Sequence, residues 1–200
     1  LPQDAAQAGL VQRLGAKTVV AAGVRALQLL GRQFVLGRDI EEALREANSQ
    51  RKDVGSLRFS FDMLGEGART EEDAERYLAS YRNAIARIAQ GVDSQAGPEV
   101  SDGISIKLSA LFSRYEESQR ERVFEVLLPR VWSLVEQAAA ANINLTIDAE
   151  ESDRLELSLD VLEALAAQIA QHFPQWKGFG LAVQAYQTRA LDVVREVGRI

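Results

Sequence analysis

Apolar and polar side chains alternate along several short stretches of this chain. The clearest stretch is residues 143–148, which read INLTID. Its odd-numbered positions are large and apolar, whereas its even-numbered positions are small or polar and end in the carboxylate of Asp148. Alternation with a period of two predicts a β-strand with two unlike faces. A strand buried on both faces would be apolar throughout, so we expect the polar face to line a site.

Three further stretches, 58–62, 103–109 and 179–186, share this design. In each of the four, one predicted face carries large apolar residues and the other carries small or polar ones. A functional group stands at or near the C-terminal end of each predicted strand, and these four groups are Asp62, Lys107, Asp148 and Gln184. The carboxyl ends of parallel strands meet at one edge of a sheet, so we expect these groups to converge there.

Helical periodicity separates the predicted strands. It predicts helices over about 71–90, 119–141 and 153–172, and the start of another near Thr188. Thr70 followed by Asp73 is typical of a helix N-terminus, and Pro129 predicts a kink or a restart in the second helix. Upstream, the sequence predicts one or two helices within 4–30 and another that begins at Asp39 and ends near Asn48. A connector over 31–37 and a turn over 52–55 bound this last helix.

Strands that alternate with helices predict an α/β fold with a parallel sheet. An open doubly wound sheet has helices on both faces, so both faces should be apolar. A (βα)8 barrel instead hides one face inside itself and places its site at the C-terminal ends of the strands. The sequence therefore predicts the first half of a (βα)8 barrel, four βα units over residues 53–200, preceded by a helical segment over residues 1–52. Small residues on the inward face leave room for a large flat ligand; these are Ser60, Ser105, Thr146, Gly180 and Ala182.

Composition narrows the functional classes. A formal net charge of −6 argues against a general nucleic-acid surface. Residues 1–38 nevertheless hold five basic side chains and one acidic one, so this segment could touch an anionic membrane surface. A packing helix with a solvated face is the more common explanation. The chain has no cysteine and a single histidine, which excludes disulfides, thiolate metal sites and poly-histidine metal sites.

Targeting signals are not visible in the sequence. No apolar run approaches the roughly 20 residues of a membrane-spanning helix, and no secretory signal peptide is recognisable. We therefore expect a cytoplasmic protein, with a possible peripheral position at the inner membrane surface. The chain does not begin with methionine and ends within a helical pattern, so we expect it to be a piece of a longer protein.

The candidate chemistry centres on Lys107. A lysine at a barrel strand end can act as a Schiff-base nucleophile, as an anchor for an anion, or as a structural partner of a neighbouring acid such as Asp148. Glu66, in the loop after the first predicted strand, is either a site acid or a solvated loop acid. The acids between residues 150 and 153 suit the N-terminus of the helix that follows them, and we expect no metal site.

Several blocks of sequence carry a family resemblance. They are FSFDMLGEGA (59–68), GISIKLSALFSRYE (103–116), LTIDAEESDRLELSLD (145–160) and GLAVQAYQTRA (180–190), and upstream GRQFVLGRDIEEAL (31–44). In order and with similar spacing, they closely resemble the proline dehydrogenase domain of the bacterial proline utilization A family. The resemblance covers most of the chain.

This resemblance implies a (βα)8 barrel that holds FAD non-covalently and oxidises L-proline to Δ1-pyrroline-5-carboxylate. In that family a hydride passes to flavin N5 and the electrons pass to a membrane quinone. It also implies an NAD-dependent aldehyde dehydrogenase domain further along a longer proline-to-glutamate enzyme, and a homo-oligomer. The alternatives are an aldolase-type barrel that forms a Schiff base on Lys107, and a non-catalytic assembly module.

The motifs also imply residue roles. Lys107 resembles the lysine that helps to bind the proline carboxylate, Asp148 the active-site aspartate, and Glu66 the acid that closes the site by pairing with an arginine of a late helix. On the cofactor side, the resemblance implies that Gln184 contacts the flavin and that Ala182 and Val183 line its ring system.

The family's later sequence blocks hold further flavin and substrate contacts and are absent from these 200 residues. The two outer predicted strands would also have unpaired edges. We therefore predict that isolated residues 1–200 neither bind FAD tightly nor oxidise proline. Proline-dependent dye reduction by the purified 1–200 chain is the measurement, and turnover above the protein-free blank would contradict this expectation.

Overall fold

The computed structural model describes residues 15, 18–27, 30–31, 35–64, 67–93, 96–149 and 152–200. The chain divides into two units, Leu1–Asp53 and Val54–Ile200, and each is described by itself. In the first unit, residues 18–27 are helical. Residues 15, 30 and 31 are helical as well. The other positions of the helix expected over 4–30, and residues 32–34 of the connector expected over 31–37, lie outside the described residues.

The helix α2 spans Ile40–Asp53 in the first unit. The Asp39 side chain accepts a hydrogen bond from the Glu42 amide at 2.8 Å, as a helix N-cap does. Glu42 does not complete a capping box with Asp39, because its carboxylate accepts from the Arg38 amide and guanidinium at 3.0 and 2.9 Å. The expected end near Asn48 is wrong, since the helix continues to Asp53. A hydrogen bond between Arg51 and the Asn48 side chain stabilises this extra turn.

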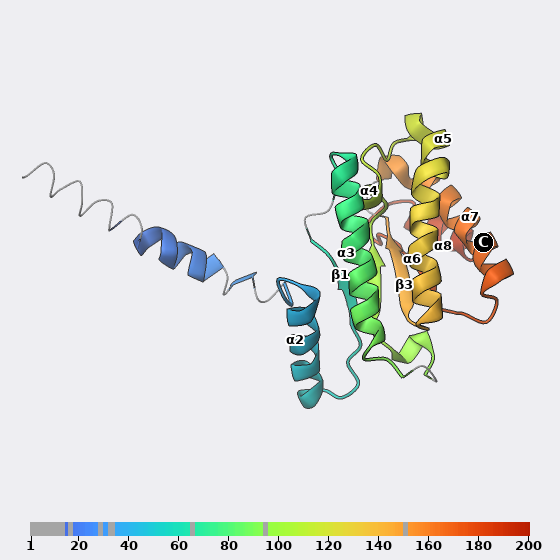
Figure 1. Cartoon of the computed structure of the whole chain (residues 1–200). Coiled ribbons are helices and arrows are strands. Elements are labelled where there is room, and N and C mark those ends of the chain that lie inside the picture. Colours follow the sequence, from blue (N-terminus) through green and yellow to red (C-terminus); the bar gives the residue numbers. More distant parts are fainter. Residues whose placement is uncertain are drawn as a thin grey trace, which may run out of the picture. The chain divides into compact units, whose positions relative to one another are not determined.

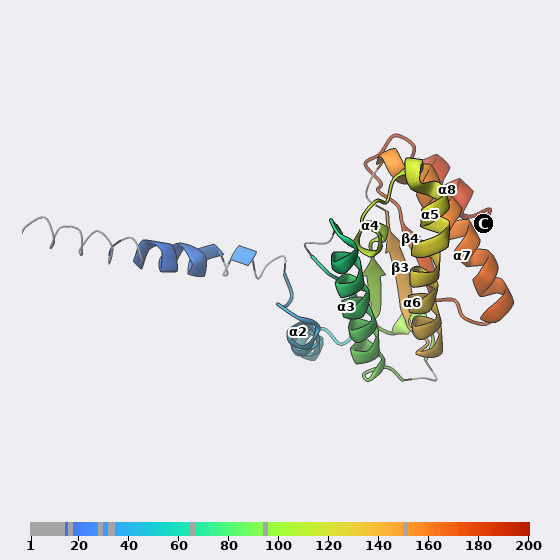
Figure 2. The ribbon, with the colours of Figure 1, turned by 45° about the horizontal axis from the view of Figure 1, so that its top comes forward.

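A four-stranded parallel sheet forms the centre of the second unit (Figures 1 and 2). Its strands are β1 (Ser60–Asp62), β2 (Gly103–Ile106), β3 (Asn144–Asp148) and β4 (Phe179–Ala182). They lie side by side in sequence order. The register aligns Asp62 with Ser105, and Asp148 with Ala182. This arrangement confirms the predicted α/β fold, the first half of a barrel with four βα units.

Helices follow each strand. They are α3 (Glu71–Ala89), α4 (Leu108–Leu111), α5 (Arg120–Arg122), α6 (Leu128–Ala140), α7 (Leu155–His172) and α8 (Ala190–Val197), with 3₁₀ turns at Pro98–Val100, Glu117–Gln119 and Ser152–Arg154. The helices α3 and α6 lie side by side, and they contact β2 and β3 respectively (Figure 1). The buried sheet face is the apolar one predicted from the sequence: Phe61, Ile104, Ile106, Leu145 and Ile147.

The helix α3 begins as the sequence predicts. Thr70 and Asp73 form a complete capping box, in which each side chain accepts a hydrogen bond from the other residue's amide. A hydrogen bond from Arg76 holds the pKa of Asp73 below its ordinary value. One stripe of the helix is buried against the rest of the unit: Ala74, Leu78, Tyr81, Ala84, Ile85 and Ile88.

The predicted restart lies next to Pro129, because a separate helix, α6, begins at Leu128. A π-helical turn at Val123–Leu127 joins α5 to α6, and the Leu128 amide donates to the Val123 carbonyl. Pro129 then occupies the first turn of α6, where a missing N–H costs little. The chain therefore accommodates the proline by widening one turn.

Three predicted strands are too long. The strand expected over 103–109 ends at Ile106, because the Lys107 amide donates to the Tyr81 hydroxyl at 3.1 Å and residues 108–111 form α4. The strand expected over 58–62 begins only at Ser60, because the Phe59 amide bonds the Asp102 side chain. The strand expected over 179–186 ends at Ala182, and a turn follows it.

Gly103 marks a close approach between β2 and β3. A Cβ atom at this position would lie 2.6 Å from the Asn144 carbonyl oxygen and 2.7 Å from the Asn144 Cβ. Because the nearest atom belongs to the backbone, the strands must shift to admit any side chain. We predict that Gly103→Ala lowers the free energy of unfolding by about 1–3 kcal/mol. Urea denaturation followed by tryptophan fluorescence measures the loss.

Gly55→Ala is the matched control, because a Cβ there would have nothing within 4 Å. Its free energy of unfolding should stay within about 0.5 kcal/mol of the wild type. Equal unfolding midpoints for the two variants would contradict the prediction. They would show that a side chain at position 103 does not destabilise the pairing of β2 with β3.

Candidate functional site

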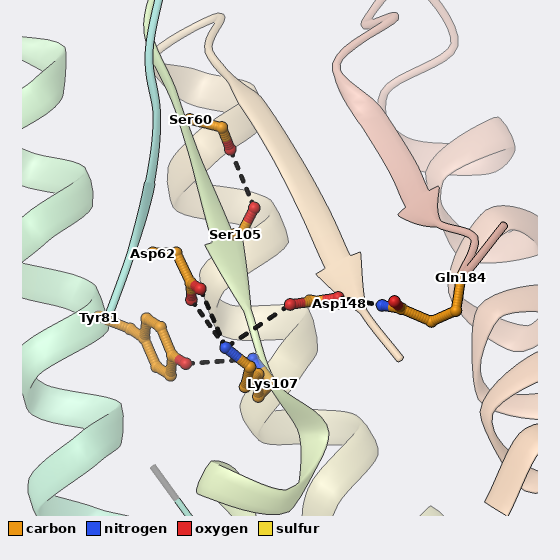
Figure 3. A network of polar contacts seen from close by, with 7 residues as sticks. All are labelled: Ser60, Asp62, Tyr81, Ser105, Lys107, Asp148 and Gln184. Carbon is orange, nitrogen blue, oxygen red and sulfur yellow. Dashed lines mark hydrogen bonds and ion pairs between the residues drawn. The ribbon is translucent and has the colours of Figure 1, made fainter. Parts of the chain in front are cut away.

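Lys107 stands where the chain leaves the sheet. It follows the last residue of β2 and has extended backbone angles of φ −109° and ψ 130°, and α4 begins at the next residue. Its side chain is 6% exposed. It lies between side chains from both neighbouring strands, Asp62 at the end of β1 and Asp148 at the end of β3 (Figure 3). The parallel register brings these three strand ends together.

The Lys107 ammonium bonds both acids, with unequal distances. Its Nζ lies 3.1 and 3.0 Å from the two carboxylate oxygens of Asp62 and 3.5 Å from Oδ2 of Asp148. The side chains of Asp62 and Asp148 are 35% and 15% exposed. A buried ammonium is costly to desolvate unless it is paired. The two carboxylates offset that cost and together leave the three-residue cluster with one negative charge.

Gln184 orients Asp148 from the far side. It follows β4 by two residues, and its Nε2 donates to Oδ1 of Asp148 at 3.2 Å. Asp148 therefore contacts Gln184 through one oxygen and Lys107 through the other (Figure 3). This chain of contacts spans all four strand ends, from Asp62 to Gln184.

The sheet face that carries Lys107 and Asp148 also carries small polar residues farther from the strand ends. The hydroxyls of Ser60 and Ser105 are 2.9 Å apart (Figure 3), and Thr146 donates to the Asn144 side chain at 3.1 Å. A Cβ at Gly180 would have no heavy atom within 4 Å. Side chains on this face are therefore short, and most of their polar groups bond one another.

The structure brings together the four strand-end residues singled out from the sequence: Asp62, Lys107, Asp148 and Gln184. Ala182 and Val183 lie directly before Gln184 and are half-buried. Glu66 lies outside the described residues. The sequence also allowed a purely structural role for Lys107, as the partner of Asp148. In the structure Asp62 lies closer to the ammonium than Asp148 does.

Sequence reasoning missed one contributor, Tyr81. This fully buried side chain of α3 accepts the hydrogen bond from the Lys107 amide. The helical periodicity places Tyr81 on the buried stripe, but no motif connects it with Lys107, which is 26 residues away.

Neither a metal-ion cluster nor a membrane-spanning helix occurs among the described residues. They contain no group of three or more histidine, cysteine or acidic side chains arranged to hold a metal ion. Within the same part of the chain, no helix has the length and apolar character needed to cross a membrane.

Comparison with known proteins places this geometry in context. The sequence model of the family described as Proline dehydrogenase matches residues 43–199. Bifunctional protein PutA of Escherichia coli is 47% identical over 169 residues, which cover 84% of this chain and 12% of that protein. Bifunctional protein PutA of Rhizobium meliloti is 42% identical, over 95% of this chain and 15% of that protein.

A crystal structure of a Proline Utilization A variant from Bradyrhizobium japonicum has a TM-score of 0.72 and 47% sequence identity. The match covers 95% of this chain and 19% of that one. This chain thus spans a small part of the length of the relatives it matches, 12% for the Escherichia coli protein.

The unequal distances in the acid–lysine cluster lead to a prediction. Double-mutant cycles pairing Lys107→Met with Asp62→Asn, and with Asp148→Asn, measure the two coupling energies. We predict a coupling of about 1–2 kcal/mol for Asp62 and a smaller one for Asp148, because the Asp148 contact is longer. Urea denaturation of the four variants in each cycle supplies the free energies. A larger coupling to Asp148 would reverse the ranking inferred from the distances.

Proposed function

The chain belongs to the proline dehydrogenase family of oxidoreductases, and we propose that it is part of a flavoenzyme that oxidises L-proline to Δ1-pyrroline-5-carboxylate. The match to the family over residues 43–199 supports this proposal. Because the chain spans only part of its relatives, the activity belongs to the whole protein. In this proposal residues 1–52 form a helical segment that precedes the half-barrel of residues 53–200.

The observation that carries the proposal is the buried ammonium of Lys107 at the edge where all four strands end. A fixed positive charge at a strand end can anchor the carboxylate of a small zwitterion. Lys107 therefore binds the proline carboxylate in this proposal. Asp62 and Asp148 hold the ammonium in place from both sides, which keeps the bound carboxylate in one position. A fixed carboxylate in turn orients the ring carbon from which hydride leaves.

The residues beside Lys107 suit a flavin. Its flat ring system needs a surface without large side chains, and the row from Ser60 and Ser105 to Gly180 is such a surface. Ala182 and Val183 would line the ring system, and Gln184 would contact it through its amide, which can both donate and accept. When bound, FAD supplies the two-electron acceptor for the hydride. Asp148 keeps the Gln184 side chain oriented through its hydrogen bond at 3.2 Å.

Glu66 completes the proposed set of catalytic residues. The sequence MLGEGA that contains it follows β1 directly, so this loop begins at the strand end that carries Asp62. We propose that Glu66 closes the site over the substrate by pairing with an arginine from a later helix of the whole protein.

The remaining parts of the proposal concern the whole protein. The relatives from Escherichia coli and Rhizobium meliloti are both named as bifunctional. This name supports a second active site elsewhere in the whole protein, outside residues 1–200, which we propose to be an NAD-dependent aldehyde dehydrogenase domain. We further propose that a membrane quinone reoxidises the flavin, and that the protein is a cytoplasmic homo-oligomer that reaches the inner membrane surface peripherally.

The geometry speaks against an aldolase-type role for Lys107. A Schiff-base lysine attacks a carbonyl as a neutral amine. Two carboxylates within 3.5 Å of Nζ instead stabilise the charged ammonium. The Lys107 side chain is therefore better suited to act as a charged ammonium that forms ion pairs than to form a covalent bond with a carbonyl carbon.

Anaerobic titration of the full-length protein with L-proline tests the proposal. We predict that proline bleaches the flavin absorbance. Lys107→Met should raise the dissociation constant for proline about 10- to 100-fold, because one charge-assisted hydrogen bond contributes about 1.5–3 kcal/mol.

Lys177→Met is the control, since Lys177 is exposed and bonds the nearby carbonyl of Pro174. It should bind proline as the wild type does. A yellow protein that proline does not bleach would move the substrate to another amine. A colourless protein that cannot be reconstituted with FAD would refute the cofactor assignment.

A further inference from the structure

Tyr81 connects the site to the helical layer. It lies on α3 with its side chain fully buried, and its hydroxyl oxygen accepts a hydrogen bond from the Lys107 amide at 3.1 Å (Figure 3). A tyrosine hydroxyl in an apolar interior needs a polar partner. Here the partner is the backbone of the residue that carries the buried ammonium.

The Lys107 amide lies at the point where regular pairing stops. The register of β2 with β3 ends at Ile106 and Ile147, and α4 begins at Leu108. The register of β1 with β2 ends one residue earlier, at Asp62 and Ser105, so Lys107 lies beyond both registers, yet it is buried. An unsatisfied buried amide is costly, and the Tyr81 hydroxyl supplies an acceptor for the Lys107 amide just beyond the registers. It thereby sets where the backbone leaves β2.

A second contact ties the same turn to the first βα unit. The Ala68 amide donates to the Ser109 carbonyl at 2.9 Å. Ser109 is two residues beyond Lys107, and Ala68 lies just before α3. Loss of the Tyr81 hydroxyl would therefore leave the turn attached through Ser109. Such a change would release the Lys107 backbone itself without unfolding α4.

We infer that Tyr81 is a positioning residue for Lys107 and that its hydroxyl sets the affinity of the site for the substrate carboxylate. This inference rests on the proposed function. The backbone hydrogen bond fixes the Lys107 Cα, and the side chain then reaches both Asp62 and Asp148. A shift of that Cα moves the ammonium relative to both acids, and so moves the carboxylate anchor.

Steady-state kinetics of full-length Tyr81→Phe test the inference. An anchor that acts equally on bound substrate and transition state changes KM and leaves kcat alone. We expect the KM for proline to rise about 3- to 10-fold, as loss of one neutral hydrogen bond would produce, with kcat within about 2-fold.

Tyr115→Phe is the matched control. It removes another buried tyrosine hydroxyl, one that lies 2.8 Å from the Ser158 hydroxyl and outside the cluster around Lys107. If the loss of any buried tyrosine hydroxyl raises KM, Tyr81→Phe and Tyr115→Phe will change KM alike. The inference is then wrong.

The Lys107→Met background separates positioning from general damage. There the KM effect of Tyr81→Phe should disappear, because the group that Tyr81 positions is gone. An undiminished effect in that background would overturn the inference. If the wild type itself is not reduced by proline, the proposed function has failed, and this outcome is distinct from an unchanged KM in Tyr81→Phe.

Incorporation of 3-fluorotyrosine at position 81 keeps the test decisive should Tyr81→Phe fail to fold. Fluorine weakens the hydroxyl as an acceptor while the ring and its packing remain. The expected result is a KM above that of the wild type and below that expected for Tyr81→Phe, with an unchanged kcat. No change in KM would contradict the inference.

Discussion

The buried ammonium of Lys107 is the constraint on which the site depends. An ammonium taken out of water is tolerated in a fold only when opposite charges and hydrogen bonds surround it. Here those groups come from both neighbouring strands, through Asp62 on β1 and Asp148 on β3. The parallel register must therefore be kept for electrostatic reasons as well as for backbone pairing. A slip of one residue would turn these side chains toward the apolar helices.

Alternation of side chains was sufficient to predict the four strands, their two faces and the shared edge of Asp62, Lys107, Asp148 and Gln184. It was not sufficient to predict where strands end. The alternating pattern runs on through Ser109, but pairing stops at Ile106 because the Lys107 amide bonds Tyr81 on α3. Periodicity reports only which face a side chain occupies. Strand length depends here on a helix that is distant in sequence.

The same reason explains the contacts that the sequence did not predict. Asp62 and Lys107 are 45 residues apart, and their separation of 3.0 Å depends on register and side-chain rotamers together. The family motifs pointed to Asp148, which lies farther from the ammonium. Tyr81 carried no signal beyond its place on a buried stripe, because a core tyrosine and a positioning tyrosine have the same periodicity. Glu66 remains a prediction, as its loop lies outside the described residues.

The arrangement divides the work between protein and cofactor. In the proposed function a flavin would supply the redox chemistry when bound, so this chain would need only to hold charges at fixed positions. Rigid supports serve that purpose better than loops do. Lys107 is held at its backbone by a helix hydroxyl and at its ammonium by two strand-end carboxylates. Both ends of the side chain are therefore fixed by regular secondary structure. Because the Lys107 side chain is only 6% exposed, salt should screen these ion pairs far less than it screens pairs on the surface.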